Sequence, residues 1–437
     1  MNILVGMSDL PAGIFMFCVL LITYLYSRIG DRKAQIYQTT LVTYITFIYL
    51  ASALICSACF SETEFFLASD PTRYITMVRS SKSYDLLFDE ITNAYVLLKD
   101  NNGLYNSLLR LLGIICNENG YTASSLLITL PQTLFGILSI QTVFRIFINH
   151  FTYKRALHYS FLFGICSLTL LYSCIIVRDI IIVFFFTVCL EVILKPFSMK
   201  GVVIIILMMA LCIGIRLYSG CFISLFLVYY LLFGCKSTIS KVIAYAFAIV
   251  AAVSIGGSVI VTELVEKTNE EISGYSEWQG DIASSEEGFS SKLRNLPNGI
   301  NYLALSLYSQ MNPFPPYSTF KDTDLKFNKM YMATLMMVPA IWWFFISYSL
   351  LWFLFFNRGY RFLGKQYFFL FCIAWLLIIV SSAMHVDIRR LLPVYPIIFY
   401  LSMICSNFIF SRKHVKIVCR NLGVGYIILN IIYIVIK

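Results

Sequence analysis

Long apolar runs alternate with short polar stretches along almost the whole chain. A helix needs about 20 apolar residues to cross a bilayer, with a usual range of roughly 17–25. The pattern therefore predicts an all-α, polytopic membrane protein that forms a single transmembrane domain over residues 1–437. About twelve candidate spans meet the length requirement: residues 9–27, 39–60, 121–147, 157–177, 179–195, 201–216, 217–235, 242–263, 332–356, 366–384, 391–410 and 421–436.

Two of the apolar runs are too long for one crossing. Arg178-Asp179 divides the run from 157 to 195, and Arg216 divides the run from 201 to 235. Charged side chains are costly inside a bilayer. We therefore expect each of these positions to mark a turn between two spans.

The basic residues of the short loops predict the orientation of the chain. Cytoplasmic loops of membrane proteins carry an excess of lysine and arginine. One set of alternate loops has this excess, which places these loops in the cytoplasm and both termini outside it. The basic residues of the set are Arg28, Arg32, Lys33, Lys154, Arg155, Lys195, Lys200, Lys236, Lys241, Arg358, Arg361, Lys365, Arg412, Lys413, Lys416 and Arg420.

Two long connections lie on the outer side in this topology. They span residues 61–120 and 264–331, and both are rich in acidic residues. Each contains an apolar stretch too short to cross a bilayer, Leu104–Cys116 and Leu303–Met311, which we expect to form an interfacial or re-entrant helix. Long loops held by a rigid scaffold are where function concentrates.

The composition supports a membrane protein. The chain is 59% hydrophobic and only 13% charged, whereas soluble domains carry roughly 25% charged residues. The net charge of +10 is spread along the chain, which fits membrane-flanking cations and no nucleic-acid partner. The 13 cysteines lie mostly inside apolar segments, which argues against a disulfide scaffold or a structural zinc.

Three arginine sites break the charge rule on the outer side. Arg178, Arg216 and the Arg389-Arg390 pair each lie at the end of an apolar segment, where short outer loops avoid cations. A guanidinium offers a planar fork of donors that matches phosphate oxygens. We favour a site for an anionic ligand, while a single arginine at a helix end is equally explained by a side chain that reaches the lipid headgroups.

Two further segments combine groups that could carry chemistry. His385 and Asp387 precede Arg389, and the histidine has a pKa suited to proton transfer near neutral pH. Asp70, Arg73 and Tyr74 open the first long loop, although Asp before Pro also starts helices. For both segments a purely structural role, as helix cap or link, stays open.

Other polar and aromatic residues have simpler explanations. Asp322-x-Asp324 matches the pattern of metal-dependent sugar transfer, but such pairs are common in polar loops, and we expect no metal there. Glu191 is explained by a pair with Lys195 four residues later. The Trp342-Trp343 pair fits lipid-facing or interfacial packing.

With these residues in place, the chain resembles the Wzy-type polymerases of O-antigen and capsular polysaccharide, including the EpsG-like group. The likeness is architectural over almost the whole chain, and its motifs are short. They are Asp70-Pro-Thr-Arg73-Tyr74, the Arg178-Asp179 turn, Arg216 opening a span, the region Asn312–Tyr317, and His385-x-Asp387-x-Arg389-Arg390.

The resemblance implies a glycosyltransferase of a bacterial inner membrane with a GT-C-like fold. Such an enzyme moves a growing glycan from undecaprenyl pyrophosphate to the terminal sugar of a new lipid-linked repeat unit at the periplasmic face. It implies no metal or other cofactor, and a chain-length regulator protein as partner in the biosynthesis of lipopolysaccharide or related glycans. The catalytic candidates are Asp70, Arg73, His385 and Asp387, and the substrate-binding candidates are Arg178, Arg216, Tyr218, Arg389, Arg390, Tyr74 and Asn312.

Three other classes of membrane protein fit parts of the pattern. A flippase for lipid-linked oligosaccharides has a similar number of spans, but transporters commonly show internal repeats and ionisable residues at mid-membrane. An O-antigen ligase shares the substrate and the membrane face, so sequence alone separates it poorly from a polymerase. A membrane acyltransferase is expected to place its histidine and arginine nearer the cytoplasm.

Overall fold

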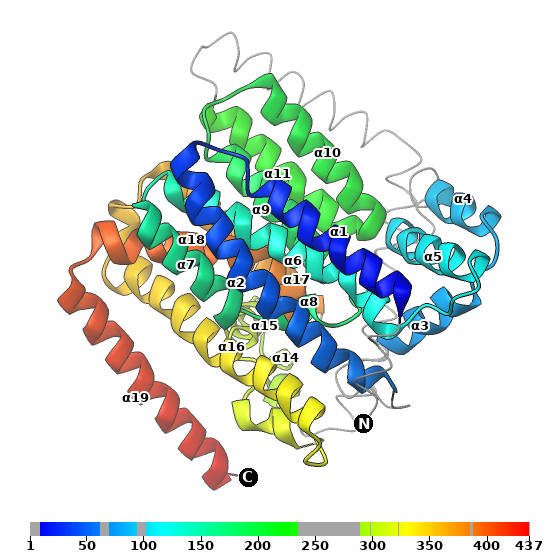
Figure 1. Cartoon of the computed structure of the whole chain (residues 1–437). Helices are drawn as coiled ribbons and strands as arrows, with labels where there is room; N and C mark the ends of the chain where they lie inside the picture. The colour runs from blue at the N-terminus through cyan, green and yellow to red at the C-terminus, as the bar shows by residue number, and fades with distance from the viewer. Residues whose placement is uncertain are drawn as a thin grey trace.

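The part of the chain that can be described is helical throughout. The computed structural model describes residues 9–61, 70–93, 102–234, 289–297, 299–321, 323–384 and 388–436, and within these ranges there is no strand. Figure 1 shows a bundle of helices with a group of shorter helices at one end. The predicted all-α class is confirmed.

Helix α6 (Ser125–Ile148) lies at the centre of the first half of the chain. It is buried along almost its whole length and packs against α1 (Leu10–Tyr26), α2 (Arg32–Ser57), α7 (Tyr153–Cys166) and α9 (Asp179–Ile193). The side chain of Ser124 caps α6 by accepting from the Leu127 amide at 3.1 Å. A helix this apolar and this enclosed forms the core of the bundle.

The two expected breaks are present. Between α7 and α9 the chain forms only a short helix, α8 (Thr169–Ser173), and Arg178 directly precedes α9. Arg216 is the single residue between α10 (Met199–Ile215) and α11 (Leu217–Gly234). The Tyr230 hydroxyl near the end of α11 accepts from the Ser198 amide at the start of α10 at 2.8 Å, so the two helices form an antiparallel hairpin with Arg216 at its tip.

The second half of the bundle contains α16 (Phe327–Leu351), α17 (Lys365–Met384), α18 (Tyr395–Ile404) and α19 (Arg412–Ile436). A 3-10 turn, η7 (Ile388–Val394), leads into α18 and packs against α9. Helix α19 runs along the outside of the bundle beside α16 and is mostly exposed (Figure 1). Its C-terminal half exposes apolar residues such as Ile427, Ile431 and Val435, as expected for a surface that faces lipid, whereas its N-terminal part exposes basic residues such as Arg412 and Arg420.

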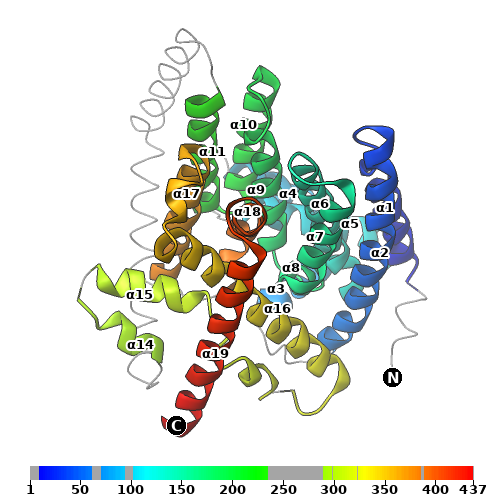
Figure 2. The same cartoon turned by 90° about the vertical axis from the view of Figure 1, so that its left-hand side faces the viewer.

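The long connections contain helices of their own. In the first, α3 (Asp70–Ser80), α4 (Asp85–Thr92) and α5 (Gly103–Glu118) pack on one another at one end of the bundle. In the second, α14 (Phe289–Arg294), α15 (Ile300–Ser309) and η4 (Pro316–Phe320) precede α16. Figure 2 shows α14 and α15 at the edge of the bundle. The short helices expected near 104–116 and 303–311 are therefore present.

Seven helices of the described residues are long and apolar enough to cross a membrane. They are Arg32–Phe60, Ser125–Ile148, Leu217–Gly234, Phe327–Phe356, Lys365–Ala383, Arg389–Ile409 and Arg412–Val435. Two shorter apolar helices, α1 and α10, also lie on predicted spans. The predicted span 242–263 lies outside the described residues, and the count of twelve stays a prediction.

Close contact between α3 and α5 fixes the position of α3. A Cβ added at Gly113 of α5 would lie 2.2 Å from the Val78 carbonyl oxygen of α3, too close for any other residue. We expect Gly113→Ala to push the two helices apart and to lower the stability by about 1–3 kcal/mol, the usual cost of overpacking. Thermal unfolding in detergent measures this loss.

Gly13→Ala is the matched control, because its added Cβ in helix α1 would meet nothing within 4 Å. Alanine is a better helix former than glycine by up to about 1 kcal/mol. An unfolding temperature for Gly113→Ala at or above that of Gly13→Ala would contradict the close contact between α3 and α5.

Candidate functional site

The two arginine turns lie side by side. Arg178 and Asp179 stand at the start of α9, and Arg216 stands at the tip of the α10–α11 hairpin. An Arg216 Nη1 to Asp179 Oδ1 distance of 2.6 Å joins the two turns in an ion pair, and both side chains are almost completely buried. The Arg178 Nη1 donates to the carbonyl oxygen of Ile215 at 3.1 Å. Two positions that each break an apolar run therefore meet at one place.

Arg389, of the third arginine site, lies in the same region and contacts the first long connection. Arg389 of η7 donates from Nη1 to Asp70 Oδ2 at 2.9 Å. Asp70 is the first residue of α3, followed by a proline, which fits the start of a helix. This ion pair links two residues that are 319 positions apart in the sequence.

Aromatic side chains line the same region. Tyr74 of α3 packs edge-on against Tyr105 of α5, with ring centroids 5.0 Å apart. The Tyr105 hydroxyl donates to the side-chain oxygen of Gln132 in α6 at 2.6 Å. The Arg216 guanidinium carbon lies 5.4 Å from the ring centroid of Tyr218, within the range of a cation–π contact. Tyr74 and Tyr105 thereby anchor the first long connection to the bundle beside the arginines.

Electrostatic coupling joins these groups into one site. Helix α9, which begins with Asp179, packs against η7, which carries Arg389, and Asp179 pairs with Arg216, so these charges lie in one region. Burial raises the pKa of the Tyr74 phenol above its ordinary value, although the nearby Arg178 cation opposes this shift. We call the set the arginine cluster: Asp70, Tyr74, Arg178, Asp179, Arg216, Tyr218 and Arg389.

The arginine cluster carries a net positive charge. Among the described residues it holds three guanidinium groups and two carboxylates. Charged groups near buried apolar walls attract counter-charges more strongly than they do in water, because the surroundings are less polarisable. Guanidinium groups that converge from separate segments can hold an anion with several oxygens.

Other candidates from the sequence are placed differently. Arg73 lies one helical turn after Asp70 on α3 and is exposed, whereas Asp70 forms its ion pair with Arg389. Arg390 is half-buried in η7. His385 and Asp387 lie outside the described residues.

The region Asn312–Tyr317 has mixed exposure. Asn312 is half-buried, and Tyr317 is exposed. The Phe314 ring packs edge-on against Tyr426 and Tyr433 of α19, with ring centroids 6.2 and 5.7 Å apart. Phe314 therefore fastens this region to α19, and only the exposed Tyr317 presents an open ring.

Asp324 of the acidic pair in the second long connection forms an ion pair with Lys329. Asp324 Oδ2 lies 3.3 Å from the Lys329 ammonium group, and Asp322 is outside the described residues. Within the ranges that can be described, no group of three or more His, Cys, Asp or Glu residues is arranged to hold a metal ion.

A buried polar network ties the second long connection to the bundle. Gln310, next to α15, accepts from the Trp343 indole at 2.9 Å and from the Ser347 hydroxyl at 3.2 Å. Ser382 of α17 donates to Ser309 of α15 at 2.8 Å. Trp343 is completely buried and stacks on Tyr395. The expectation that Trp343 faces lipid is therefore wrong, because its indole N–H is bonded inside the protein.

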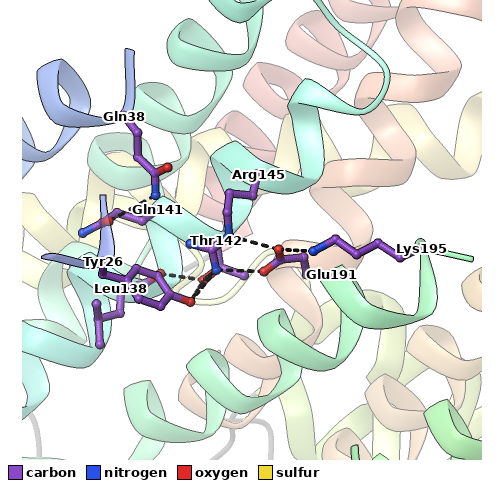
Figure 3. A network of polar contacts seen from close by, with 8 residues as sticks. All are labelled: Tyr26, Gln38, Leu138, Gln141, Thr142, Arg145, Glu191 and Lys195. Carbon is purple, nitrogen blue, oxygen red and sulfur yellow. Dashed lines mark hydrogen bonds and ion pairs between the residues drawn. The ribbon is translucent and has the colours of Figure 1, made fainter. Parts of the chain in front are cut away.

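A second charged network occupies the other end of α9. Arg145 of α6 forms two parallel hydrogen bonds to the Glu191 carboxylate, at 3.0 and 2.8 Å, and Lys195 donates to the same carboxylate at 2.6 Å. Arg145 also donates to the Tyr26 hydroxyl of α1, and Figure 3 shows Arg145 and Lys195 pointing at Glu191 from opposite sides. Nearby, Gln38 of α2 donates to Gln141 at 3.2 Å. The ion pair of Glu191 with Lys195, predicted from their i,i+4 spacing, is present. The second, buried partner of Glu191, Arg145, was not predicted from the sequence.

Sequence reasoning also overlooked a C-x-x-C pair, with Cys56 near the end of α2 and Cys59 in the following 3-10 turn η2 (Ala58–Ser61). Both residues are buried, and the Cys59 thiol lies 2.9 Å from the sulfur of Met332 in α16. No disulfide joins any of the cysteines in the described ranges. The pair contributes to the packing between α2 and α16.

Comparisons with known proteins give no relatives. Neither a protein-family profile nor a curated protein nor a solved structure matches the chain.

Proposed function

We propose that this protein is a polysaccharide repeat-unit polymerase of a bacterial inner membrane. One observation carries the proposal: Arg178, Arg216 and Arg389 come from three distant segments and meet in one cluster beside the first long connection. A site that handles a lipid-linked diphosphate needs several fixed cations at a membrane surface. The resemblance to Wzy-type polymerases supplies the reaction, and no nucleic acid takes part.

The proposed reaction exchanges one glycosidic bond for another. A hydroxyl of the new repeat unit attacks the anomeric carbon of the growing glycan, and the bond from that carbon to the diphosphate oxygen breaks. The bonding electrons leave with the undecaprenyl pyrophosphate, where arginines stabilise the developing negative charge. A carboxylate such as Asp70 takes the proton of the attacking hydroxyl.

The topology that serves this reaction places the arginine cluster at the periplasmic face and both termini outside the cytoplasm. The two charged networks lie at opposite ends of α9, and Lys195 of the second belongs to the short basic loops assigned to the cytoplasm. The positive-inside rule therefore supports a periplasmic position for the arginine cluster. A chain-length regulator protein is the proposed protein partner.

Two alternatives keep a physical basis. A ligase acts on the same diphosphate at the same face, so the arginine cluster suits it equally. A flippase draws support from the buried Arg145–Glu191 pair, because transporters use ionisable residues inside the membrane. In this protein that pair is closed by two parallel hydrogen bonds, which suits a structural role, so we place the polymerase first.

Deletion of the gene in its own bacterium separates the three functions. A polymerase defect removes the long glycan ladder from a gel and retains glycan with a single repeat unit. A ligase defect removes all attached glycan, and a flippase defect accumulates lipid-linked repeat units on the inner leaflet. We expect the first pattern, with the ladder restored by the wild-type gene on a plasmid.

A further inference from the structure

The two ion pairs of the arginine cluster differ sharply in exposure. The Asp179 and Arg216 side chains are 2% and 7% exposed, whereas those of Asp70 and Arg389 are 41% and 23% exposed. The first pair belongs to the framework of the bundle. The second joins the bundle to α3 and is open to solvent.

The exposure of each ion pair decides whether a dissolved anion can displace its carboxylate from the arginine. Separating a buried pair leaves a charge without a partner in surroundings that cannot solvate it. An exposed pair is stabilised only weakly, because water and salt compete for both charges. An anion that enters the arginine cluster will therefore displace Asp70 from Arg389 before it disturbs Asp179 and Arg216.

The Asp70 carboxylate already occupies a position suited to a phosphate oxygen. Its Oδ2 lies 2.9 Å from Arg389 Nη1, a normal distance for a guanidinium that binds an oxyanion. With Asp70 in place, the three arginines and two aspartates that define the arginine cluster carry a net charge of +1. Without Asp70 the same set carries +2, which matches the two negative charges of a diphosphate diester.

We propose that Asp70 is an internal latch that holds the place of a phosphate group and is displaced when the diphosphate of the substrate binds. This inference rests on the proposed function, and it concerns the regulation of the same site, the arginine cluster. The bound diphosphate releases the Asp70 carboxylate from Arg389. Only then is the carboxylate available to take the proton of the attacking hydroxyl, so the base acts when the donor substrate is bound.

Binding of inorganic pyrophosphate to the full-length protein in lipid nanodiscs tests the latch. Asp70→Asn removes the competing charge and keeps the size of the side chain, so we expect its Kd to fall about tenfold or more. The control is Asp89→Asn, which removes the same charge from an exposed position of α4 in the same connection. Its Kd should stay within about twofold of the wild type, because distant exposed charges are screened by salt.

A measurement on the wild type makes the test independent of any substitution. Added pyrophosphate should speed amide hydrogen exchange in residues 70–80, because α3 loses its tie to Arg389. It should slow exchange around the α10–α11 turn, where the anion binds. Unchanged or slower exchange in α3 overturns the latch, even if Asp70→Asn fails to fold.

The outcomes separate the latch from the proposed function. An unchanged or raised Kd for Asp70→Asn, or an equal fall for Asp89→Asn, overturns the latch and leaves the polymerase proposal intact. Tighter pyrophosphate binding by Asp70→Asn supports the latch. If the deletion strain nevertheless makes a normal glycan ladder, the polymerase proposal is rejected while the latch stands. If neither the wild type nor Asp70→Asn binds pyrophosphate, both the latch and the polymerase proposal are rejected.

Discussion

Replacement of Arg216 by lysine is expected to leave the protein folded and to abolish the glycan ladder. Lysine keeps a positive charge beside the buried Asp179, so no carboxylate is left without a partner. It lacks the planar fork with which arginine binds two oxygens at once. Loss of one fixed donor to a developing oxyanion lowers reaction rates by about 10²–10³-fold in well-studied enzymes.

Arg216→Ala separates the structural role of this residue from its proposed chemical role. Alanine leaves Asp179 buried and unpaired, which costs about 3–5 kcal/mol when one partner of a buried ion pair is removed. A thiol-reactive dye measures the loss on heating, because Cys174 and Cys189 are buried in the folded protein. We expect Arg216→Ala to unfold at a clearly lower temperature than Arg216→Lys.

The matched control for both variants is Arg420→Lys, an exposed position on α19 away from the arginine cluster. It should unfold like the wild type and support a full ladder. If Arg216→Lys also supports a full ladder, the guanidinium of Arg216 does not contact the reacting groups. The arginine cluster would then serve only to hold the turns together.

The helices and their breaks were predictable because hydropathy and charge act locally. A run of apolar residues longer than one bilayer crossing must turn, and Arg178 and Arg216 are where polar groups permit the turn. Whether these turns lie next to one another depends on which helices pack together, and a local pattern does not contain that information. Arg178, Arg216 and Arg389 could therefore be predicted as site residues from the sequence, whereas their contacts could not.

Partners across long sequence distances were beyond the reach of local patterns. Asp70 pairs with Arg389 instead of its near neighbour Arg73, because α3 turns the two side chains to different surroundings. The sequence analysis identified Asp179 only as part of the turn with Arg178. In the structure its carboxylate is the buried counter-charge of Arg216. The adjacency of Asp179 to Arg178 at a break in an apolar run was the one signal that pointed to it.

Hydropathy also fails to separate lipid-facing from protein-facing side chains. Trp342 and Trp343 stand next to each other in α16, but Trp343 is fully buried while Trp342 is half-buried. Neighbouring side chains of a helix point in different directions, and Trp343 points toward Gln310, which accepts from its indole N–H. Because Gln310 belongs to the second long connection, only the tertiary structure reveals this bond.

Helix α9 carries a charged network at each of its ends. Asp179 pairs with Arg216 at one end and Glu191 pairs with Arg145 at the other, about 18 Å away along the helix axis at 1.5 Å per residue. Between them the helix is almost wholly buried. Each network joins α9 to a different neighbour, so α9 acts as a rigid strut that positions Asp179 and the arginine cluster.

Glu191→Gln tests this strut and is expected to lower the stability by about 3–5 kcal/mol. The neutral amide leaves Arg145 as a buried cation that lacks its counter-charge, and both side chains are less than a tenth exposed. Thermal unfolding followed by the reactivity of Cys189, which is buried within α9 itself, measures the change directly.

Lys195→Gln is the control that removes the other partner of the same carboxylate. The Lys195 side chain is 51% exposed, so its ion pair with Glu191 should contribute only about 0–1 kcal/mol. The Arg145–Glu191 pair stays intact in this variant. Equal unfolding temperatures for Glu191→Gln and Lys195→Gln would contradict the strut, because exposed and buried partners of Glu191 would then stabilise α9 alike.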